Sequence, residues 1–255
     1  MGINPGISTD YSRNIVGACE VVYFMRKILI ILLIVTAGQG AYAQVKGFVG
    51  LKGGGHLSTA YIEHTIYNTF MNTGFIPGYQ GGLMLKLFTN RSSTSFLNAG
   101  LQSGLAYEQK GWKQTFATDE PTYHIKMSYL NFPVEAMAYA GKGNTKFFFT
   151  LGMFTEWLVN VEKDPDPNPD NMGTGVEFYT YEENRDRTFG YGVRLSLGVQ
   201  HEFPFGAIHL DGFISYSVSS LMKTEDLDNR LPDLSNHYLA GFTVAYMIPF
   251  GKMDF

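Results

Sequence analysis

The sequence has little cysteine, little charge and none of the short motifs of common enzyme classes. Its 255 residues contain a single cysteine, Cys19, and one thiol cannot form an internal disulfide. Charged residues make up 16% of the chain, whereas soluble domains average roughly 25%. The net charge of -4 argues against nucleic acid as a partner. No phosphate-binding loop, G-x-S-x-G or zinc pattern is present, so we expect no cofactor and no catalytic residues.

Long hydrophobic runs are also missing after residue 43, where no stretch approaches the roughly 20 apolar residues of a spanning helix. Before that point, Met25-Arg26-Lys27 precedes the short apolar run 28–37 and then Ala41-Tyr42-Ala43. A basic start, a short apolar run and an A-x-A site are typical of a cleavable signal peptide. Residues 1–24, which include Asp10 and Glu20, precede the basic segment with which a signal peptide begins. We therefore expect translation to begin at Met25. Residues 1–43 would then be removed, leaving one domain over residues 44–255.

What the chain does have is aromatic residues and glycine, with 20 phenylalanines, 16 tyrosines and 29 glycines. These residues are arranged with a period of two, which indicates β-strands. In residues 189–202, one face is large and apolar: Phe189, Tyr191, Val193, Leu195, Leu197 and Val199. The other face is small or polar: Gly190, Gly192, Arg194, Ser196, Gly198, Gln200 and Glu202. Such a strand is half-buried in water or faces lipid with its apolar side in a membrane barrel.

The same alternation predicts eight strands in all. They cover residues 45–54, 78–88, 96–109, 123–140, 146–161, 189–202, 207–219 and 238–250. In the fourth run the phase slips near Tyr129-Leu130, just before Pro133, which indicates a β-bulge.

The lengths of the connections favour a barrel over a soluble β-sandwich. The predicted connections after the odd strands are long (55–77, 110–122, 162–188, 220–237), and those after the even strands are short (89–95, 141–145, 204–206). Long and short connections alternate in this way in an up-and-down barrel with long external loops and short periplasmic turns. The sequence therefore predicts an all-β fold, an eight-stranded antiparallel up-and-down transmembrane β-barrel in a Gram-negative outer membrane. Both termini would be periplasmic.

Four segments carry a family resemblance: Gly50-Leu51-Lys52-Gly53-Gly54-Gly55, Gly78-Tyr79-Gln80-Gly81-Gly82-Leu83, residues 100–107 (GLQSGLAY) and Tyr129-Leu130-Asn131-Phe132-Pro133-Val134. Together they resemble the PorT-like outer-membrane β-barrel family, and the resemblance covers essentially all of residues 44–255. It implies an eight-stranded barrel. Some members of that family are linked to type IX secretion, and the family offers no catalytic motif to carry over.

The candidate site is a set of charged side chains on the predicted inward faces. It comprises Glu108, Glu135, Glu156, Arg194, Glu202, His209 and Asp211, together with Lys52 and Lys86. Such a set forms a polar conduit or a proton-linked site, or else a network that fills the lumen and in which the charged groups pair with one another. We favour the network, because an eight-stranded barrel is just wide enough for its own side chains and buried charges need partners. Acids outnumber bases in this set, which leaves room for one protonated or water-bound glutamate.

Two further patterns are weaker candidates. Asp164, Asp166, Asn168 and Asp170 alternate with prolines; oxygen ligands at alternate positions suggest a calcium loop, but the prolines favour an extended chain that points the carboxylates apart. We therefore expect an acidic, solvated loop and no metal.

His124 and Ser128 lie on one face near the predicted outer rim. Outer-membrane lipid hydrolases use a histidine and a serine near that rim, but this sequence shows no third catalytic residue and no oxyanion donor.

Aromatic residues of the long connections leave two interpretations open. Tyr61, Tyr67, Phe70 and Phe75 lie in the first connection, and Phe178, Tyr179 and Tyr181 in the third. They form either a partner surface or a lid over the barrel mouth.

The overall prediction is a non-enzymatic structural or accessory barrel, with a narrow channel and then a lipid-modifying enzyme as alternatives. Its expected partners are outer-membrane lipid, the barrel-assembly machinery and other envelope or secretion proteins.

Overall fold

The computed structural model describes residues 46–64, 69–89, 97–115, 122–141, 143–164, 183, 186–223 and 234–250. The predicted signal peptide, the start at Met25 and the cleavage before Gln44 lie outside these residues and stay predictions. Two strands are short, β2 (Thr69–Phe70) and β3 (Thr73–Gly74). The long ones are β1 (Lys46–His64), β4 (Ile76–Phe88), β5 (Asn98–Gln114), β6 (Tyr123–Ala140), β7 (Thr145–Asp164), β8 (Phe189–Phe203), β9 (Gly206–Ser217) and β10 (Leu234–Phe250).

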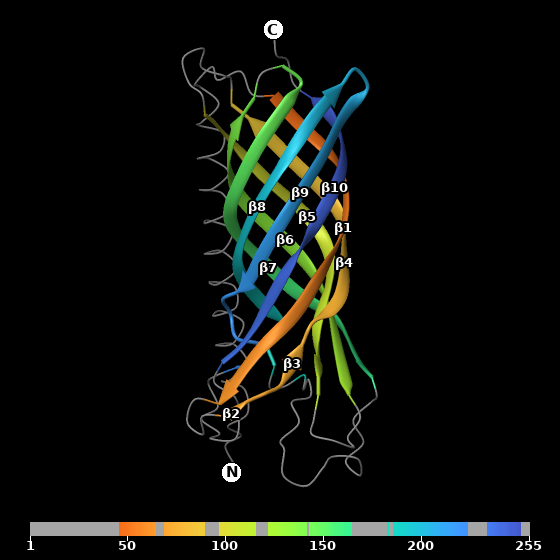
Figure 1. The fold of residues 1–255 in the computed structure, drawn as a ribbon, viewed down its shortest axis with the longest axis vertical. Coiled ribbons are helices and arrows are strands. Elements are labelled where there is room, and N and C mark those ends of the chain that lie inside the picture. The colour runs from red at the N-terminus through yellow and green to blue at the C-terminus, as the bar shows by residue number, and fades with distance from the viewer. Residues whose placement is uncertain are drawn as a thin grey trace, which may run out of the picture. The chain divides into compact units, whose positions relative to one another are not determined.

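The eight long strands form a closed antiparallel ring (Figure 1). Each pairs with its neighbour in the chain, and β10 returns to pair with β1 from Gly47–Phe250 to Glu63–Leu234. This is the predicted up-and-down barrel, and the predicted fold class is confirmed. No helix in the described part of the chain is long and apolar enough to cross a bilayer.

The stagger of the ring sets its width. Following paired residues once around the barrel from Thr59 leads back to β1 at Val49, ten residues lower. The partners passed on the way are Tyr238, Tyr216, Val193, Met153, Val134, Ser103 and Leu85. With eight strands, this offset tilts each strand by about 40° from the axis and leaves an interior that side chains fill.

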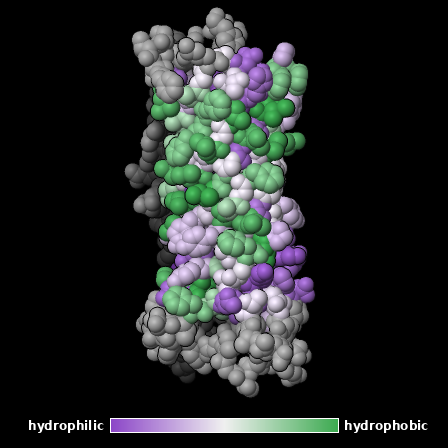
Figure 2. Space-filling model, in the orientation of Figure 1, coloured by the Kyte–Doolittle hydropathy of each residue, from purple (hydrophilic) through white to green (hydrophobic). Residues whose placement is uncertain are grey.

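The two faces of the wall follow the predicted alternation. On β8, Leu197 is 68% exposed whereas its neighbour Ser196 is 1% exposed. Hydrophobic residues cover the middle of the visible wall, and hydrophilic ones gather toward its two ends (Figure 2). The apolar surface thus forms a band suited to lipid, as a membrane barrel requires.

Several strands are longer than predicted at the end that carries the long connections, which we call the loop end. The predicted connections 55–77 and 110–122 begin inside β1 and β5, which continue to His64 and Gln114. At this end the polarity of the faces is reversed: Trp112 of β5 and Ile125 of β6 are buried inside, while Lys126 of β6 is exposed outside. Because an apolar outward face marks a strand only within the apolar band, the predicted strands corresponding to β1 and β5 end where the wall leaves that band.

The β-bulge lies beside the predicted position but on the neighbouring strand. Ser128 of β6 is opposite Asn160, whereas Tyr129 is opposite Leu158. The additional residue is therefore Val159 of β7, not a residue of β6. This shift turns Asn160 outward, where it is exposed.

The seam between β1 and β10 yields a first prediction. A Cβ atom at Gly50 would collide with the carbonyl oxygen of Tyr246, whereas a Cβ at Gly53 would come no nearer than 3.9 Å to Gln80 O. Gly50→Ala should therefore destabilise the barrel by about 1 to 3 kcal/mol through overpacking. Gly53→Ala, the matched control on the same strand, should be neutral or slightly stabilising. Urea titration of the refolded protein in vesicles, read by heat-modifiable gel mobility, measures both. Equal losses would mean that the backbones at Gly50 are not in close contact.

Candidate functional site

The lumen is layered along the barrel axis, with an apolar cluster at each end and polar side chains between. The short-turn cluster consists of Phe48, Met84, Phe88, Met137, Tyr139, Phe148, Ala207, Ala245 and Met247. The loop-end cluster consists of Ala60, Ile62, Trp112, Ile125, Met127, Tyr129, Leu221 and Met222. Every member of both clusters is buried. The charged residues between the two clusters therefore lie in a closed interior.

The first group of charges lies at the short-turn end. Glu202 of β8 forms ion pairs with Lys46 of β1 and Lys146 of β7. All three side chains keep some exposure to solvent. One carboxylate thus ties the beginning of the first strand to the β7–β8 hairpin.

A second group crosses the lumen from β4 to β9. Lys86 Nζ lies 2.9 Å from His209 Nδ1, and His209 Nε2 lies 3.2 Å from Asp211 Oδ1. Since an ammonium group can only donate, His209 Nδ1 accepts and its Nε2–H donates to Asp211. The imidazole ring also stacks on Phe148, with 4.8 Å between centroids. This geometry holds a neutral histidine between a base and an acid.

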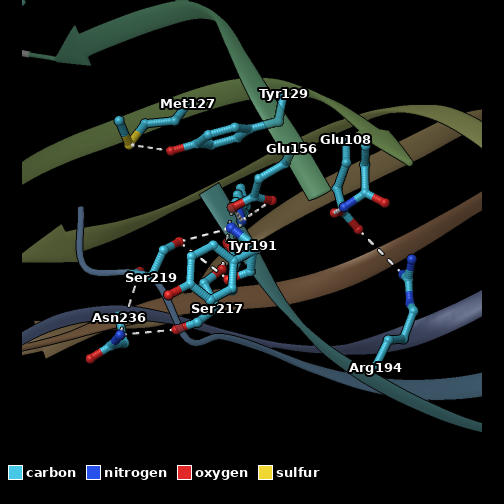
Figure 3. A network of polar contacts seen from close by, with 12 residues as sticks. Glu108, Met127, Tyr129, Glu156, Tyr191, Arg194, Ser217, Ser219 and Asn236 are labelled. Atoms are coloured by element: carbon cyan, nitrogen blue, oxygen red, sulfur yellow. Dashed lines mark hydrogen bonds and ion pairs between the residues drawn. The ribbon is translucent and has the colours of Figure 1, made fainter. Parts of the chain in front are cut away.

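Arg194 of β8 forms a third group with residues across the barrel. Its Nη2 atom donates to Gln80 Oε1 at 3.2 Å and to Glu108 Oε1 at 3.3 Å. Asn131 Nδ2 donates to the other oxygen of Glu108 at 3.1 Å. Figure 3 shows the contact between Arg194 and Glu108. The guanidinium carbon also lies 3.9 Å from the centre of the Phe213 ring, a cation–π contact.

The fourth group has the tightest buried ion pair. Lys110 Nζ donates to both oxygens of Glu156, at 2.7 and 2.6 Å, and lies 3.1 Å from Ser217 Oγ. The same ammonium group lies 4.4 Å from the centre of the Tyr129 ring. Figure 3 places Glu156 between Tyr129 and Ser217. Sequence analysis missed Lys110 because the predicted strand ended at Gln109; continuing the alternation by one residue would have found it.

Glu135 accepts only uncharged donors. Gln102 Nε2 lies 3.1 Å and Thr150 Oγ1 2.5 Å from Glu135 Oε2, and Thr150 also contacts Ser196 at 2.5 Å. Lys52 is buried near this group and within electrostatic range of Arg194, Glu108 and Asp211.

The structure places all seven predicted site residues in the lumen, but in separate contact groups. Glu202 and His209 belong to different groups, because Glu202 pairs with Lys46 and Lys146 at the rim. The charges described above comprise five acids and six bases, so the expected excess of glutamates is wrong. The sequence reading omitted three of those bases: Lys46, Lys110 and Lys146.

The weaker candidates do not assemble in the described part of the chain. Asp164 is the exposed last residue of β7, whereas Asp166, Asn168 and Asp170 lie outside the described residues. No group of three or more potential metal ligands occurs among the described residues.

His124 and Ser128 lie four residues apart on one strand, which corresponds to about 13 Å. This distance is too long for a catalytic base and its nucleophile. The hydroxyl group of Tyr107 lies 2.6 Å from Ser128 Oγ.

The aromatic residues of the first connection point outward. Tyr61, Phe70 and Phe75 are 40%, 59% and 57% exposed, and the rings of Tyr61 and Phe70 lie 6.1 Å apart. They therefore do not cover the mouth, which Leu221 and Met222 fill instead. Tyr67, Phe178, Tyr179 and Tyr181 lie outside the described residues.

Comparison with known proteins agrees with this architecture. Residues 41–223 match the family described as "Outer membrane protein beta-barrel domain". The chain belongs to this family. Membership places the protein in the outer membrane and does not single out the narrower PorT-like group. No curated protein matches the sequence.

Solved structures with a similar arrangement of strands are small outer-membrane barrels. Ail of Yersinia pestis is 12% identical, with 79% of this chain and 99% of that one covered and a TM-score of 0.36. OprG of Pseudomonas aeruginosa is 8% identical, with 82% and 98% covered and a TM-score of 0.42. Neisserial surface protein A is 11% identical, with 77% and 95% covered and a TM-score of 0.34. Such low similarity carries no information about a shared ligand or activity.

The Lys110–Glu156 pair yields a second prediction for this family member. Lys110→Met leaves the Glu156 carboxylate buried without its cation and should destabilise the barrel by about 3 to 5 kcal/mol. The double variant with Glu156→Met should recover most of that loss. Lys126→Met, on the exposed face of β6, should change the stability by no more than about 1 kcal/mol. Urea titration in vesicles measures all three, and a double variant no better than Lys110→Met would rule out a pairing role.

Proposed function

We propose that this protein is a non-enzymatic, non-conducting barrel with a structural or accessory role in the outer membrane, acting through its loop end. The observation that carries the proposal is the closure of the lumen at both ends by apolar clusters. At the short-turn end, Phe88 makes edge-on ring contacts with Phe48 at 5.5 Å and with Tyr139 at 4.9 Å. An apolar, close-packed layer offers water and ions no polar path.

The polar band between the clusters supports the same proposal. Lys110 pairs with Glu156 and Arg194 with Glu108 across the lumen, so these charges neutralise one another. A conduit would need side chains that can exchange a partner for a passing ion. With the lumen closed, the surfaces left for function are the lipid-facing wall and the two ends.

The proposed orientation puts the loop end outside the cell and both termini in the periplasm. The strand extensions support it, because β1, β5, β6, β7 and β10 rise beyond the apolar band only at the loop end. Short turns at the opposite end, such as Pro204-Phe205 between β8 and β9, suit the periplasmic side.

Planar-bilayer recording tests the closed lumen. The refolded protein should show no steady ion current at neutral pH, and Arg194→Ala should show none either, because both apolar clusters remain. A general porin recorded in the same bilayers is the positive control. A stable conductance that changes on Arg194→Ala would contradict the proposed closed lumen and would favour a narrow channel.

The accessory role includes a narrower proposal, a link to protein secretion, which rests on the resemblance to PorT-like barrels. Photo-crosslinking in intact cells tests whether the loop end contacts a protein. A photoreactive residue in place of Phe70, 59% exposed at the loop end, should yield a discrete protein adduct. The matched position Phe205, 67% exposed at the short-turn end, should yield less or none. Adducts from Phe205 alone would contradict a role through the loop end, and the identity of the trapped protein decides the link to secretion.

A further inference from the structure

The barrel wall at the loop end has a gap in its strand pairing between β7 and β10. The β7–β8 ladder ends at Trp157–Phe189, and the β9–β10 ladder ends at Tyr216–Tyr238. On either side the wall continues, to His124–Asp164 between β6 and β7 and to Glu63–Leu234 between β1 and β10. Among the described residues, no regular strand ladder closes this part of the ring.

Two short segments, residues 186–188 and 218–223, span the gap through individual hydrogen bonds and one isolated bridge between Asp186 and Met222. Leu158 N donates to Thr188 O at 2.7 Å, Arg187 N to Leu221 O at 2.7 Å, and Leu221 N to Ser235 O at 2.8 Å. Near the start of the second segment, Asn236 Nδ2 donates to the carbonyl oxygens of Ser217 and Val218 at 2.9 and 3.2 Å. The second segment is also bonded to Tyr191, Ser235 and Arg187, but it lies outside the strand ladders, so its displacement would leave those ladders intact.

Leu221 and Met222 of the second segment pack into an apolar cluster whose other members lie on regular strands. They are 6% and 1% exposed and pack in the loop-end cluster. The other members of the cluster come from strands: Ala60 and Ile62 of β1, Trp112 of β5, and Ile125, Met127 and Tyr129 of β6. Regular strands thus supply most of this apolar cluster, and displacement of the second segment would leave an apolar pocket between them.

His237 adds a polar group to this pocket. It is completely buried, and its ring lies 5.6 Å from that of Trp112 and 6.3 Å from that of Tyr129. Neither ring nitrogen makes a well-formed hydrogen bond, and the nearest backbone partner is that of Thr59. Burying an imidazole without hydrogen-bond partners destabilises the folded protein, so a ligand that bonds to His237 would stabilise it.

We propose that this pocket binds a small amphipathic molecule with an apolar body and one uncharged hydrogen-bonding head. The apolar body takes the place of the Leu221 and Met222 side chains when their segment swings out, and the head bonds to His237. An uncharged head fits because Glu156 already neutralises Lys110, the nearest cation. The short-turn cluster stays closed below, so the site is a blind pocket. It adds a binding role to the proposed accessory function and does not depend on it.

A disulfide lock provides the test. Ser220 Oγ and Ser235 Oγ lie 2.7 Å apart, so Ser220→Cys with Ser235→Cys places two thiols within bonding reach. Cys19→Ser removes the only native cysteine, and Trp157→Phe leaves buried Trp112 as the sole tryptophan. The protein in lipid nanodiscs is titrated with 1-decanol, and with decane as the probe without a head. Trp112 fluorescence and native mass spectrometry report binding.

In the reduced protein, decanol should bind saturably and about tenfold more tightly than decane, the effect of one buried hydrogen bond. Oxidation should abolish saturable binding without changing heat-modifiable mobility, which reports folding. His237→Phe in the reduced protein should lower the decanol affinity to that of decane. Equal binding in oxidised and reduced protein, or no saturable binding in the reduced protein, would overturn the proposal. Equal affinities for decanol before and after His237→Phe would overturn the role of His237. None of these results depends on ion conductance or on a protein partner, so they are separate from the proposed function.

Discussion

The narrow ring of eight strands with a ten-residue stagger is the constraint on which the rest of this structure depends. A ring of this width has no room for bulk water, so each inward side chain is also a packing residue. A charge placed there has to find a partner across the lumen, because an unpaired buried charge is strongly destabilising. The pairs formed by Lys110 with Glu156 and by Arg194 with Glu108 follow from this requirement.

The same ring meets two solvents along its length. Within the apolar band, lipid lies outside and polar side chains lie inside; beyond it, water lies outside and the inside becomes apolar, as at Trp112 and Ile125. The barrel therefore resembles a membrane protein in its middle and a soluble β-protein at its loop end. An apolar interior in that second part closes the mouth without any separate plug domain.

The two ends differ in which parts of the chain close them. At the short-turn end, the cluster is formed by side chains of regular strands. At the loop end, two of the buried side chains, Leu221 and Met222, come from a segment outside the strand ladders. The loop end can therefore change without breaking a strand ladder, and the proposed partner contacts and the proposed pocket also lie there.

The sequence by itself determined the strand number, the order of the strands and the residues that face lipid. In a barrel strand, each side chain faces either lipid or the lumen, and this alone selects an apolar or a polar residue at that position. The alternation in residues 189–202 therefore shows directly which residues face lipid. Only the tertiary structure decided which charges pair, because Lys110 and Glu156 lie on strands that are not neighbours and meet through the stagger of the ring. It also placed the additional residue at Val159, extended the strands where the faces exchange polarity, and brought Leu221 and Met222 into the mouth. Each of these features depends on contacts between distant parts of the chain, and such contacts produce no periodic pattern in the local sequence.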